Sequence, residues 1–221
     1  MSAFALSPVR PLRPRLLRLS VAASALLAVG FGAGGLWIEA KAALAQVLLE
    51  RAWSATATVG DRVKPWPWAD TWPVARLAIP RLGLHWIVLA GASGRTLAFG
   101  PGHVDGTALP GRPGHAVVAG HRDTQFSALR EMRLGDTLEI EMPSRAAARY
   151  RVTGTSVLDA RDVAGLARGD DSLTLITCWP FDALVPGGPL RYVVEAEMEA
   201  VAPAAARNGA PVAASRKGTL S

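Results

Sequence analysis

The sequence predicts an all-β domain, either a closed barrel or a sandwich, that follows a hydrophobic N-terminal helix. Seven short apolar-rich segments, many of which alternate apolar and polar residues, are separated by Gly or Pro clusters, which is typical of strands that bury one face. Ahead of these segments, a stretch of about 20 residues contains no charged side chain. A length of 221 residues accommodates one ordinary domain with appendages.

The N-terminal apolar segment, LSVAASALLAVGFGAGGLWI, covers residues 19–38. At 1.5 Å per residue, about 20 helical residues cross the ~30 Å hydrocarbon layer of a bilayer. Four arginines precede the segment, and acidic residues appear only from Glu39 onward. The positive-inside rule therefore predicts that residues 1–18 are cytoplasmic and that the chain after the span is exported, with Trp37 as an interfacial anchor.

A cleaved signal peptide and a buried core helix are the alternative interpretations of this segment. A signal peptide has a shorter apolar region, roughly 7–15 residues, and a small-residue cleavage site. The segment here is longer, and its glycine-rich end is not followed by a convincing cleavage site. We therefore expect an uncleaved anchor. A signal peptide would also lead to export of the domain.

Two connecting segments follow the predicted span. Residues 39–57 are rich in Ala and Leu at helical spacing, so residues 39–63 are interpreted as a helical membrane-proximal linker. The next ten residues, KPWPWADTWP (64–73), contain three prolines and three tryptophans. Because proline lacks the backbone donor of a helix or sheet, we expect an extended strap that packs through its side chains.

The β-domain is expected to cover residues 64–200. Its predicted strands are VARLAI (74–79), LHWIVLA (84–90), HAVVAG (115–120), DTLEIEM (136–142), RYRVTGTSVL (149–158), SLTLIT (172–177) and LRYVVEAEME (190–199). Short helical turns are expected at 127–132 and 162–168. Residues 201–221 are rich in Ala, Pro, Gly and Ser, a composition that predicts a disordered tail.

The excess positive charge lies outside the predicted domain. The isoelectric point is near 10.4, but seven of the 24 Lys and Arg residues lie before Glu39 or after residue 200, where there is no Asp or Glu. Residues 39–200 therefore contain 17 basic and 18 acidic residues, so the domain is close to neutral. A nucleic-acid-binding domain carries a basic patch of its own, and we therefore expect no nucleic-acid partner.

The single cysteine, Cys178, follows the apolar run LTLIT at the end of a predicted strand. Most free cysteines are buried and inert, and that interpretation is open here. In an exported protein, however, cysteines usually pair as disulfides, and an unpaired one is often reactive or bridges two chains. Export therefore makes Cys178 a candidate nucleophile at the rim of the sheet.

His121 and Arg191 are candidate partners of this thiol. His121 closes the apolar run AVVAG, and a histidine next to a cysteine acts as base toward the thiol and as acid toward a leaving amine. Spacing alone does not separate it from the other histidines, which are His85, His103 and His115. Arg191 lies at the start of the strand LRYVV and is suited to stabilising an oxyanion, although a surface arginine at a strand start is the simpler interpretation of this residue taken alone.

Metal and nucleotide chemistry are not expected. The sequence contains neither CxxC nor HExxH, and one cysteine cannot form a cysteine-rich zinc cluster. It also lacks a glycine-rich loop with nucleotide-binding spacing, a GxSxG elbow and an SxxK motif near the cysteine. We therefore expect neither a metal site nor a nucleotide-binding loop.

Three segments together resemble the sortase family: AGHRDTQFSAL around His121, TLITCWPF around Cys178 and LRYVV around Arg191. Their order and contexts match the GHRD-like His, the TLxTC cysteine and the downstream arginine of sortases, and the resemblance extends over most of residues 64–199. It implies a closed eight-stranded β-barrel with short helices and with these three residues catalytic at one end. It further implies that Thr177, Trp179 and Asp123 contact the substrate.

Other segments resemble the Gram-negative class (class GN) of sortases: PWPWADTWPVARL, GPGHVDGTALPG and CWPFDALVPGGPLRYVV. An uncleaved N-terminal anchor also suits that class. Two positions depart from its pattern. His115 stands where a small polar residue such as Asn is expected, and Trp179 stands where Tyr more often follows the cysteine. Both departures bear on specificity rather than on the three catalytic residue types.

The resemblance implies a membrane-anchored cysteine transpeptidase whose partners are secreted or membrane-tethered proteins with a C-terminal LPXTG-like sorting signal. Cys178 would cleave between Thr and Gly through a thioacyl intermediate, and an amine of unknown identity would accept the acyl group. The expected location is the bacterial inner membrane, single-pass, with the catalytic domain in the periplasm. The alternatives are a Cys–His peptidase that transfers to water, and a non-catalytic envelope module whose tryptophan-rich strap binds a partner.

Overall fold

The computed structural model describes residues 14–60, 62–163, 171–183, 185 and 187–199, and within the first range it leaves out the side chains of 14–17, 25–36, 38 and 39. The predicted tail at 201–221 lies outside the described residues. So do most of the predicted cytoplasmic segment and most of the helical turn expected at 162–168.

One continuous helix, α1 (Pro14–Val59), takes the place of the predicted span and linker. It ends where Gly60 adopts a positive φ of 73° and its N–H donates to the carbonyl of Thr56 at 2.9 Å, a left-handed cap that glycine adopts without steric cost. The helix therefore stops before residue 63, the end of the predicted linker. No helix in the described part of the chain is long and apolar enough to cross a membrane. The span at 19–38 includes side chains outside that description and stays a prediction.

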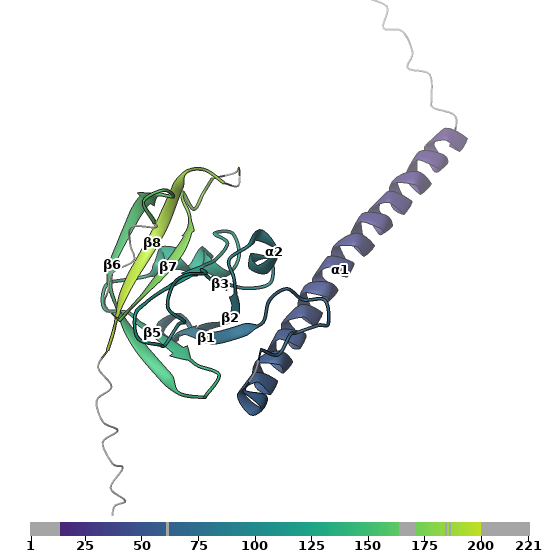
Figure 1. Ribbon diagram of the computed structural model, residues 1–221. Coiled ribbons are helices and arrows are strands. Elements are labelled where there is room, and N and C mark those ends of the chain that lie inside the picture. Colours follow the sequence, from purple (N-terminus) through teal and green to yellow (C-terminus); the bar gives the residue numbers. More distant parts are fainter. Residues whose placement is uncertain (1–13, 61, 164–170, 184, 186, 200–221) are drawn as a thin grey trace, which may run out of the picture.

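Eight strands of the described chain form a closed barrel, as predicted (Figure 1). They are β1 (Pro73–Ile79), β2 (Leu84–Ala90), β3 (Gly102–His103), β4 (His115–Ala119), β5 (Thr137–Glu141), β6 (Ala147–Asp159), β7 (Ser172–Cys178) and β8 (Leu190–Met198). Short helical segments connect them: η1 (Pro80–Leu82), α2 (Gly94–Leu97) and η2 (Gln125–Glu131).

The strand that the sequence did not delimit is β3, which has only two residues. A β-carbon on Gly102 would lie 2.3 Å from the carbonyl oxygen of Gly91. The backbones therefore approach so closely here that only glycine fits, and a glycine-rich segment carries no alternation of apolar and polar side chains.

The order of strands around the barrel is β1-β2-β3-β4-β7-β8-β6-β5, and β5 pairs with β1 to close it. Two neighbouring pairs are parallel, β2 with β3 and β4 with β7. The others are antiparallel. The parallel β4–β7 pair matters most for the site, because it brings the carboxyl ends of two strands to the same edge.

Alternate side chains of the strands fill the barrel. In β1, for example, Ala75, Leu77 and Ile79 are fully buried, while the residues between them are half-buried. From η2, the fully buried Phe126 joins this core and meets Trp86 edge-on, with ring centroids 5.9 Å apart. Burial of apolar surface is the main stabilising term of such a core. Its largest fully buried members are Tyr150, Phe126, Leu77, Ile79, Leu129, Leu138, Ile140, Leu173 and Leu175.

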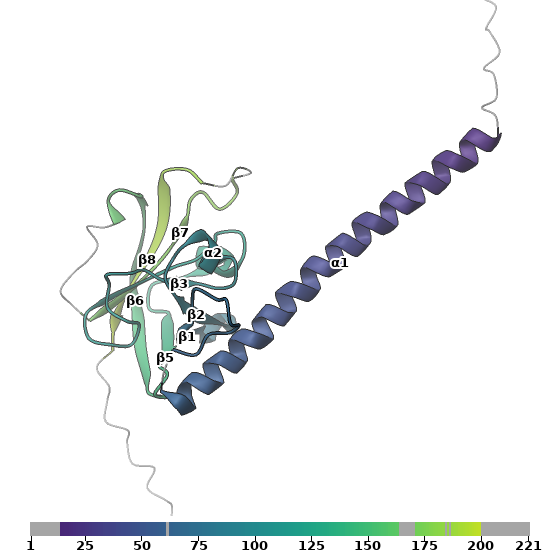
Figure 2. The same ribbon diagram turned by 45° about the vertical axis from the view of Figure 1, so that its right-hand side comes forward.

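The C-terminal part of α1 packs on the outside of the barrel, while its N-terminal part projects away from it (Figures 1 and 2). Leu49 and Trp53 are buried against Ile87 and Leu89 of β2. The guanidinium of Arg76 on β1 lies 5.8 Å from the Trp53 ring. The segment predicted as a linker is thus partly a buried element of the domain.

The tryptophan-rich strap has neither helix nor strand from residue 64 to 72, as its prolines predict, and its last residue, Pro73, begins β1. Thr71 fastens it by donating its hydroxyl to the carbonyl of Ala90 at 2.7 Å. The ring of Trp66 packs edge-on against Phe99, with centroids 4.9 Å apart. Trp68, in contrast, is 83 % exposed.

Candidate active site

The carboxyl ends of β4 and β7 meet at one edge of the barrel. Ala119 pairs with Ile176 at the end of their parallel register, and the N–H of Gly120 then donates to the carbonyl of Ile176 at 3.0 Å. His121 directly follows Gly120, and Cys178 is the last residue of β7, so both residues lie at the ends of neighbouring strands on the same edge. Cys178 is a free, half-buried thiol, and His121 is exposed.

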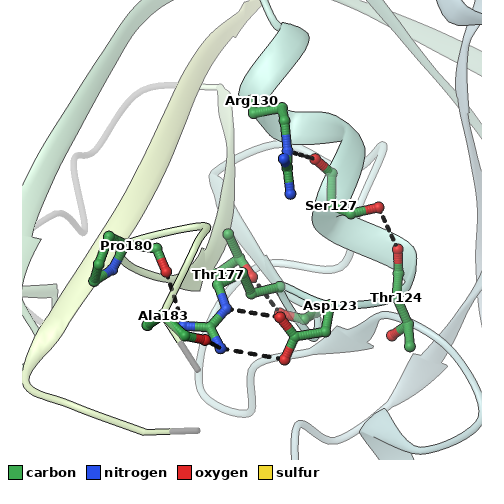
Figure 3. A network of polar contacts seen from close by, with 9 residues as sticks. Asp123, Thr124, Ser127, Arg130, Thr177, Pro180 and Ala183 are labelled. Atoms are coloured by element: carbon green, nitrogen blue, oxygen red, sulfur yellow. Dashed lines mark hydrogen bonds and ion pairs between the residues drawn. The ribbon is translucent and has the colours of Figure 1, made fainter. Parts of the chain in front are cut away.

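A buried hydroxyl joins the backbone next to these two residues. Thr177, which precedes Cys178, is 2 % exposed and donates its Oγ1 hydrogen to the carbonyl of Gly120 at 2.8 Å (Figure 3). The Thr177 hydroxyl, which the resemblance implied as a substrate contact, is thus engaged with the backbone at this edge of the barrel. It ties the end of β7 to the residue before His121.

Arg191 lies directly across from Cys178 in the antiparallel β7–β8 register. Residues opposite each other in such a pair project from the same face, with their β-carbons about 4.5–5.5 Å apart. The Arg191 guanidinium donates through one nitrogen, Nη1, to the carbonyls of Gly188 at 2.8 Å and Leu190 at 2.9 Å. The three predicted catalytic residues thus come from three adjacent segments of one barrel edge.

The tertiary structure gives the four histidines different environments and so distinguishes His121 from the other three. His103 is buried on β3 beside the carbonyl of Ala108, with its Nε2 at 2.9 Å. His115 opens β4, at the opposite end of that strand from His121, and its Nε2 lies 2.8 Å from the Thr174 hydroxyl. His115 therefore lies away from the cysteine edge. His85 is exposed on β2.

Asp123 forms an ion pair with its neighbour Arg122, with Nε and Oδ1 2.8 Å apart (Figure 3). The Asp123 side chain is 65 % exposed and that of Arg122 only 3 %. The hydrogen bond from Arg122 lowers the pKa of Asp123, and His121 and Arg130 add smaller effects in the same direction. Arg122 was not among the predicted site residues. The only feature of the sequence that pointed to a role for Arg122 was its position in the GHRD segment, because the pattern of apolar and polar residues there does not indicate that it is buried.

An aromatic cluster stands beside Cys178. The Trp179 ring stacks on Tyr192 of β8 with centroids 5.7 Å apart, and Phe181 meets both rings edge-on. Arg130 covers Phe181 with its guanidinium carbon 5.1 Å from the ring centroid. The half-buried Trp179 is therefore held rigidly next to the thiol, where the sequence predicted a substrate contact. Aromatic packing of this kind is worth about 0.5–1.5 kcal/mol per pair beyond burial.

In the parts of the chain that the structure describes, no three His, Cys, Asp or Glu side chains gather into a group that could hold a metal ion. The groups at this edge are instead a thiol, an imidazole and a guanidinium. Together they can supply a nucleophile, a proton carrier and a cation for an oxyanion.

The fold and the site together place the protein in a class of closed β-barrels that carry a cysteine, a histidine and an arginine at one edge. The family model described as the sortase domain matches residues 77–199, more than half of the chain. The chain therefore belongs to the sortase family.

Similar proteins agree with this assignment. Sortase D of Bacillus subtilis (strain 168) is 31 % identical over 120 residues, which are 53 % of this chain and 60 % of that protein. The chain thus spans about three fifths of the length of this relative.

Solved structures are similar as well. Sortase C-1 of Actinomyces oris is 29 % identical with a TM-score of 0.52 and covers 58 % of this chain and 75 % of its own. Sortase A of Corynebacterium diphtheriae is 25 % identical with a TM-score of 0.54, over 73 % and 87 % of the two chains. A Clostridium perfringens sortase D5 transpeptidase shares the fold at 21 % identity, with a TM-score of 0.58 over 72 % and 99 %.

Proposed function

We propose that this chain is a membrane-anchored cysteine transpeptidase that cleaves an LPXTG-like sorting signal between Thr and Gly and transfers the acyl group to an amine. The observation that carries the proposal is the position of Cys178 and His121 on parallel neighbouring strand ends, with Arg191 opposite the cysteine. Membership of the sortase family supports the same reaction class. The sequence segments that resemble the Gram-negative class add that subclass to the proposal.

In the first half-reaction, the Cys178 thiolate attacks the carbonyl carbon of the substrate threonine. The tetrahedral intermediate collapses with cleavage of the Thr–Gly C–N bond, and His121 gives its proton to the departing glycine amine. Arg191 donates to the oxyanion, a role that fits its place opposite the cysteine. The product is a thioester between the substrate threonine and Cys178.

In the second half-reaction, the acceptor amine attacks the thioester carbonyl and passes a proton to His121. The C–S bond breaks, an amide forms and the Cys178 thiolate is regenerated. Trp179 and Asp123 flank the site and are proposed to contact the sorting signal. No metal or organic cofactor enters either step.

We further propose that residues 19–38 anchor the chain once in the bacterial inner membrane, with residues 1–18 in the cytoplasm and the catalytic domain, residues 64–200, in the periplasm. The uncharged run and the four arginines before it support this topology. A substrate that is held by its own hydrophobic segment would then meet a tethered enzyme at a raised effective concentration.

The test is incubation of the full-length chain in mild detergent with an LPXTG peptide, with and without a small primary amine, followed by mass spectrometry. We expect a thioacyl adduct on Cys178 and an amide product. Cys178→Ala should lose both, His121→Ala should lose product, and the control His85→Ala, an exposed histidine on β2, should keep full activity. Free acid as the only product would identify a peptidase instead.

The non-catalytic module is a second candidate because one observation favours it. Trp66 and Trp68 line a cavity of about 560 Å³ against Leu44 and Leu48 of α1. If the strap is the functional surface, a Cys178→Ala chain would still mature a co-expressed LPXTG-tailed protein. Normal maturation by that variant would overturn the transpeptidase proposal.

A further inference from the structure

The arginine that follows His121 has an unusual environment for a charged residue. Arg122 has a side-chain exposure of 3 %, whereas arginine is rarely buried unless its donors are paired. Its guanidinium makes four hydrogen bonds, and they lead to two separate segments of the chain. The burial of a cation with this many hydrogen bonds next to a proposed catalytic residue suggests a specific structural role for Arg122.

Two of the hydrogen bonds stay local. Nε donates to Oδ1 of Asp123 at 2.8 Å and Nη2 donates to Oδ2 at 3.3 Å. This bidentate pair neutralises the guanidinium, and it raises the pKa of Arg122. Weaker attraction to Cys178 and Asp182 acts in the same direction.

The other two hydrogen bonds reach the segment after β7. Nη1 donates to the carbonyl of Pro180 at 2.8 Å, and Nη2 donates to the carbonyl of Ala183 at 3.0 Å. Figure 3 shows Pro180 and Ala183 on one side of this polar network and Asp123 on the other. These carbonyls lie two and five residues beyond Cys178, so one guanidinium joins the segment that carries His121 to the segment that carries the thiol.

The same segment is held from a second side by the aromatic cluster. Trp179 and Phe181 pack on Tyr192, while the carbonyls of Pro180 and Ala183 face Arg122. The residues directly after the thiol are thus fixed by rings on one side and by a fork of donors on the other. Loss of the fork leaves the rings in place but frees the backbone on the side of His121.

We propose that Arg122 is a positioning residue for the reaction, and that its guanidinium sets the spacing between His121 and Cys178 by clamping the two segments together. The inference rests on the proposed function of that pair. It adds a residue that touches neither substrate nor thiol in the proposed reaction and acts through the backbone on both sides of the site.

A guanidinium suits this role because it presents five donors in a rigid planar fork. An ammonium group is a single point with three donors on a flexible stem, and it cannot reach Asp123, Pro180 and Ala183 together in the same geometry. Lysine at this position would therefore keep the charge and lose the clamp. This difference separates a geometric role from a purely electrostatic one.

The experiment compares Arg122→Lys and Arg122→Gln with the wild-type full-length chain in the peptide and amine assay. A misplacement of about 1 Å costs on the order of 100-fold in rate, so we expect kcat to fall about 30- to 100-fold and KM to stay within about threefold. In Arg122→Ala, added guanidinium ion should restore part of kcat, because it refills the vacated site.

Arg81→Gln is the matched control. Arg81 forms a similar clamp elsewhere on the barrel, with Nε 2.6 Å from Asp136 Oδ1 and Nη2 2.6 Å from the carbonyl of Glu131. Its loss should lower the melting temperature and leave kcat unchanged. Arg122 variants with kcat within threefold of this control would overturn the inference.

The outcomes also separate the inference from the function on which it rests. A wild-type chain that forms neither adduct nor product contradicts the proposed function. An active wild type with active Arg122 variants contradicts only the clamp. If Arg122→Gln does not fold, Arg122→Lys decides, because it keeps a cation beside Asp123; full activity in the folded Lys variant refutes the geometric role.

Discussion

Substitution of Gly120 by alanine tests how tightly the turn before His121 is packed. A β-carbon at this position would lie 2.6 Å from Cδ2 and 2.7 Å from Cγ of Phe126, distances at which one of the groups must move. Gly120 is not among the residues with positive φ, so alanine tolerates its backbone conformation. The cost of the substitution therefore comes from crowding against the ring and not from backbone strain.

The ring has little room to retreat. Phe126 is fully buried in the barrel core, and Trp86 packs edge-on against it with centroids 5.9 Å apart. Overpacking a core of this kind costs typically 1–3 kcal/mol, and we expect about 2 kcal/mol for Gly120→Ala. For a domain of this size, that corresponds to a fall in melting temperature of roughly 6–8 °C. Because His121 is the next residue, kcat should fall as well, about tenfold for a displacement below 1 Å.

Urea unfolding of the full-length chain in mild detergent, followed by tryptophan fluorescence, measures the change. Gly94→Ala is the control, since a β-carbon there meets no atom within 4 Å, and its stability should stay within about 0.5 kcal/mol of the wild type. Phe126→Leu removes the ring and should itself cost about 1–2 kcal/mol through the cavity it leaves. Combined with Gly120→Ala, the pair should cost about 1 kcal/mol less than the sum, because the cavity accepts the new methyl group. A Gly120→Ala chain as stable as the wild type, or strictly additive costs in the double variant, would refute the crowding.

Three further perturbations follow from the contacts described above. Thr177→Val removes the donor to the turn before His121 while keeping the side-chain shape; we expect a loss of about 1–2 kcal/mol in urea unfolding with a lower kcat, and an unchanged kcat would contradict its positioning role. The hydrogen bond from Arg81 lowers the pKa of Asp136 below its usual 3.8, so the stabilising effect of this ion pair is complete above about pH 4 and is lost as pH falls through the lowered value. Asp136→Asn should therefore be less stable than the wild type at pH 7, and its melting temperature should vary less between about pH 2 and 5. An equal pH dependence of the melting temperature in the two proteins would count against the pair. Trp53→Ala should cost about 3–5 kcal/mol and speed limited proteolysis of α1. The exposed Leu44 on the same helix is a control position whose replacement by alanine should leave the cleavage rate unchanged.

Much of the barrel was predictable because strand formation leaves a local signature. The predicted strand at 84–90 matches β2 residue for residue, and the one at 74–79 differs from β1 only at Pro73. The alternation that identifies such strands is a property of a few consecutive side chains. The signature failed at β3, where close backbone contact replaces side-chain packing.

The candidate site was predictable to a different degree. Cys178 and His121 could be selected from their places at strand ends and from the motifs around them. Their proximity depends on the parallel pairing of β4 with β7, which joins residues 115–119 to residues 172–176. The local sequence likewise did not indicate that Thr177 is buried. Nor did it indicate that Arg122 donates to carbonyls 58 and 61 residues away in the chain.

The amino-acid sequence alone thus determined the all-β class, the near-neutral charge of the domain, the apolar segment at 19–38 and the residue types available for catalysis, because composition, periodicity and local motifs encode each of these. Only the tertiary structure decided that α1 packs on β2 and that His103 and His115 lie in structural contacts. It alone also showed that Arg122 joins both sides of the site. The physical reason is that each of these contacts pairs residues from segments remote in the chain, and their geometry is set by the closure and register of the barrel as a whole.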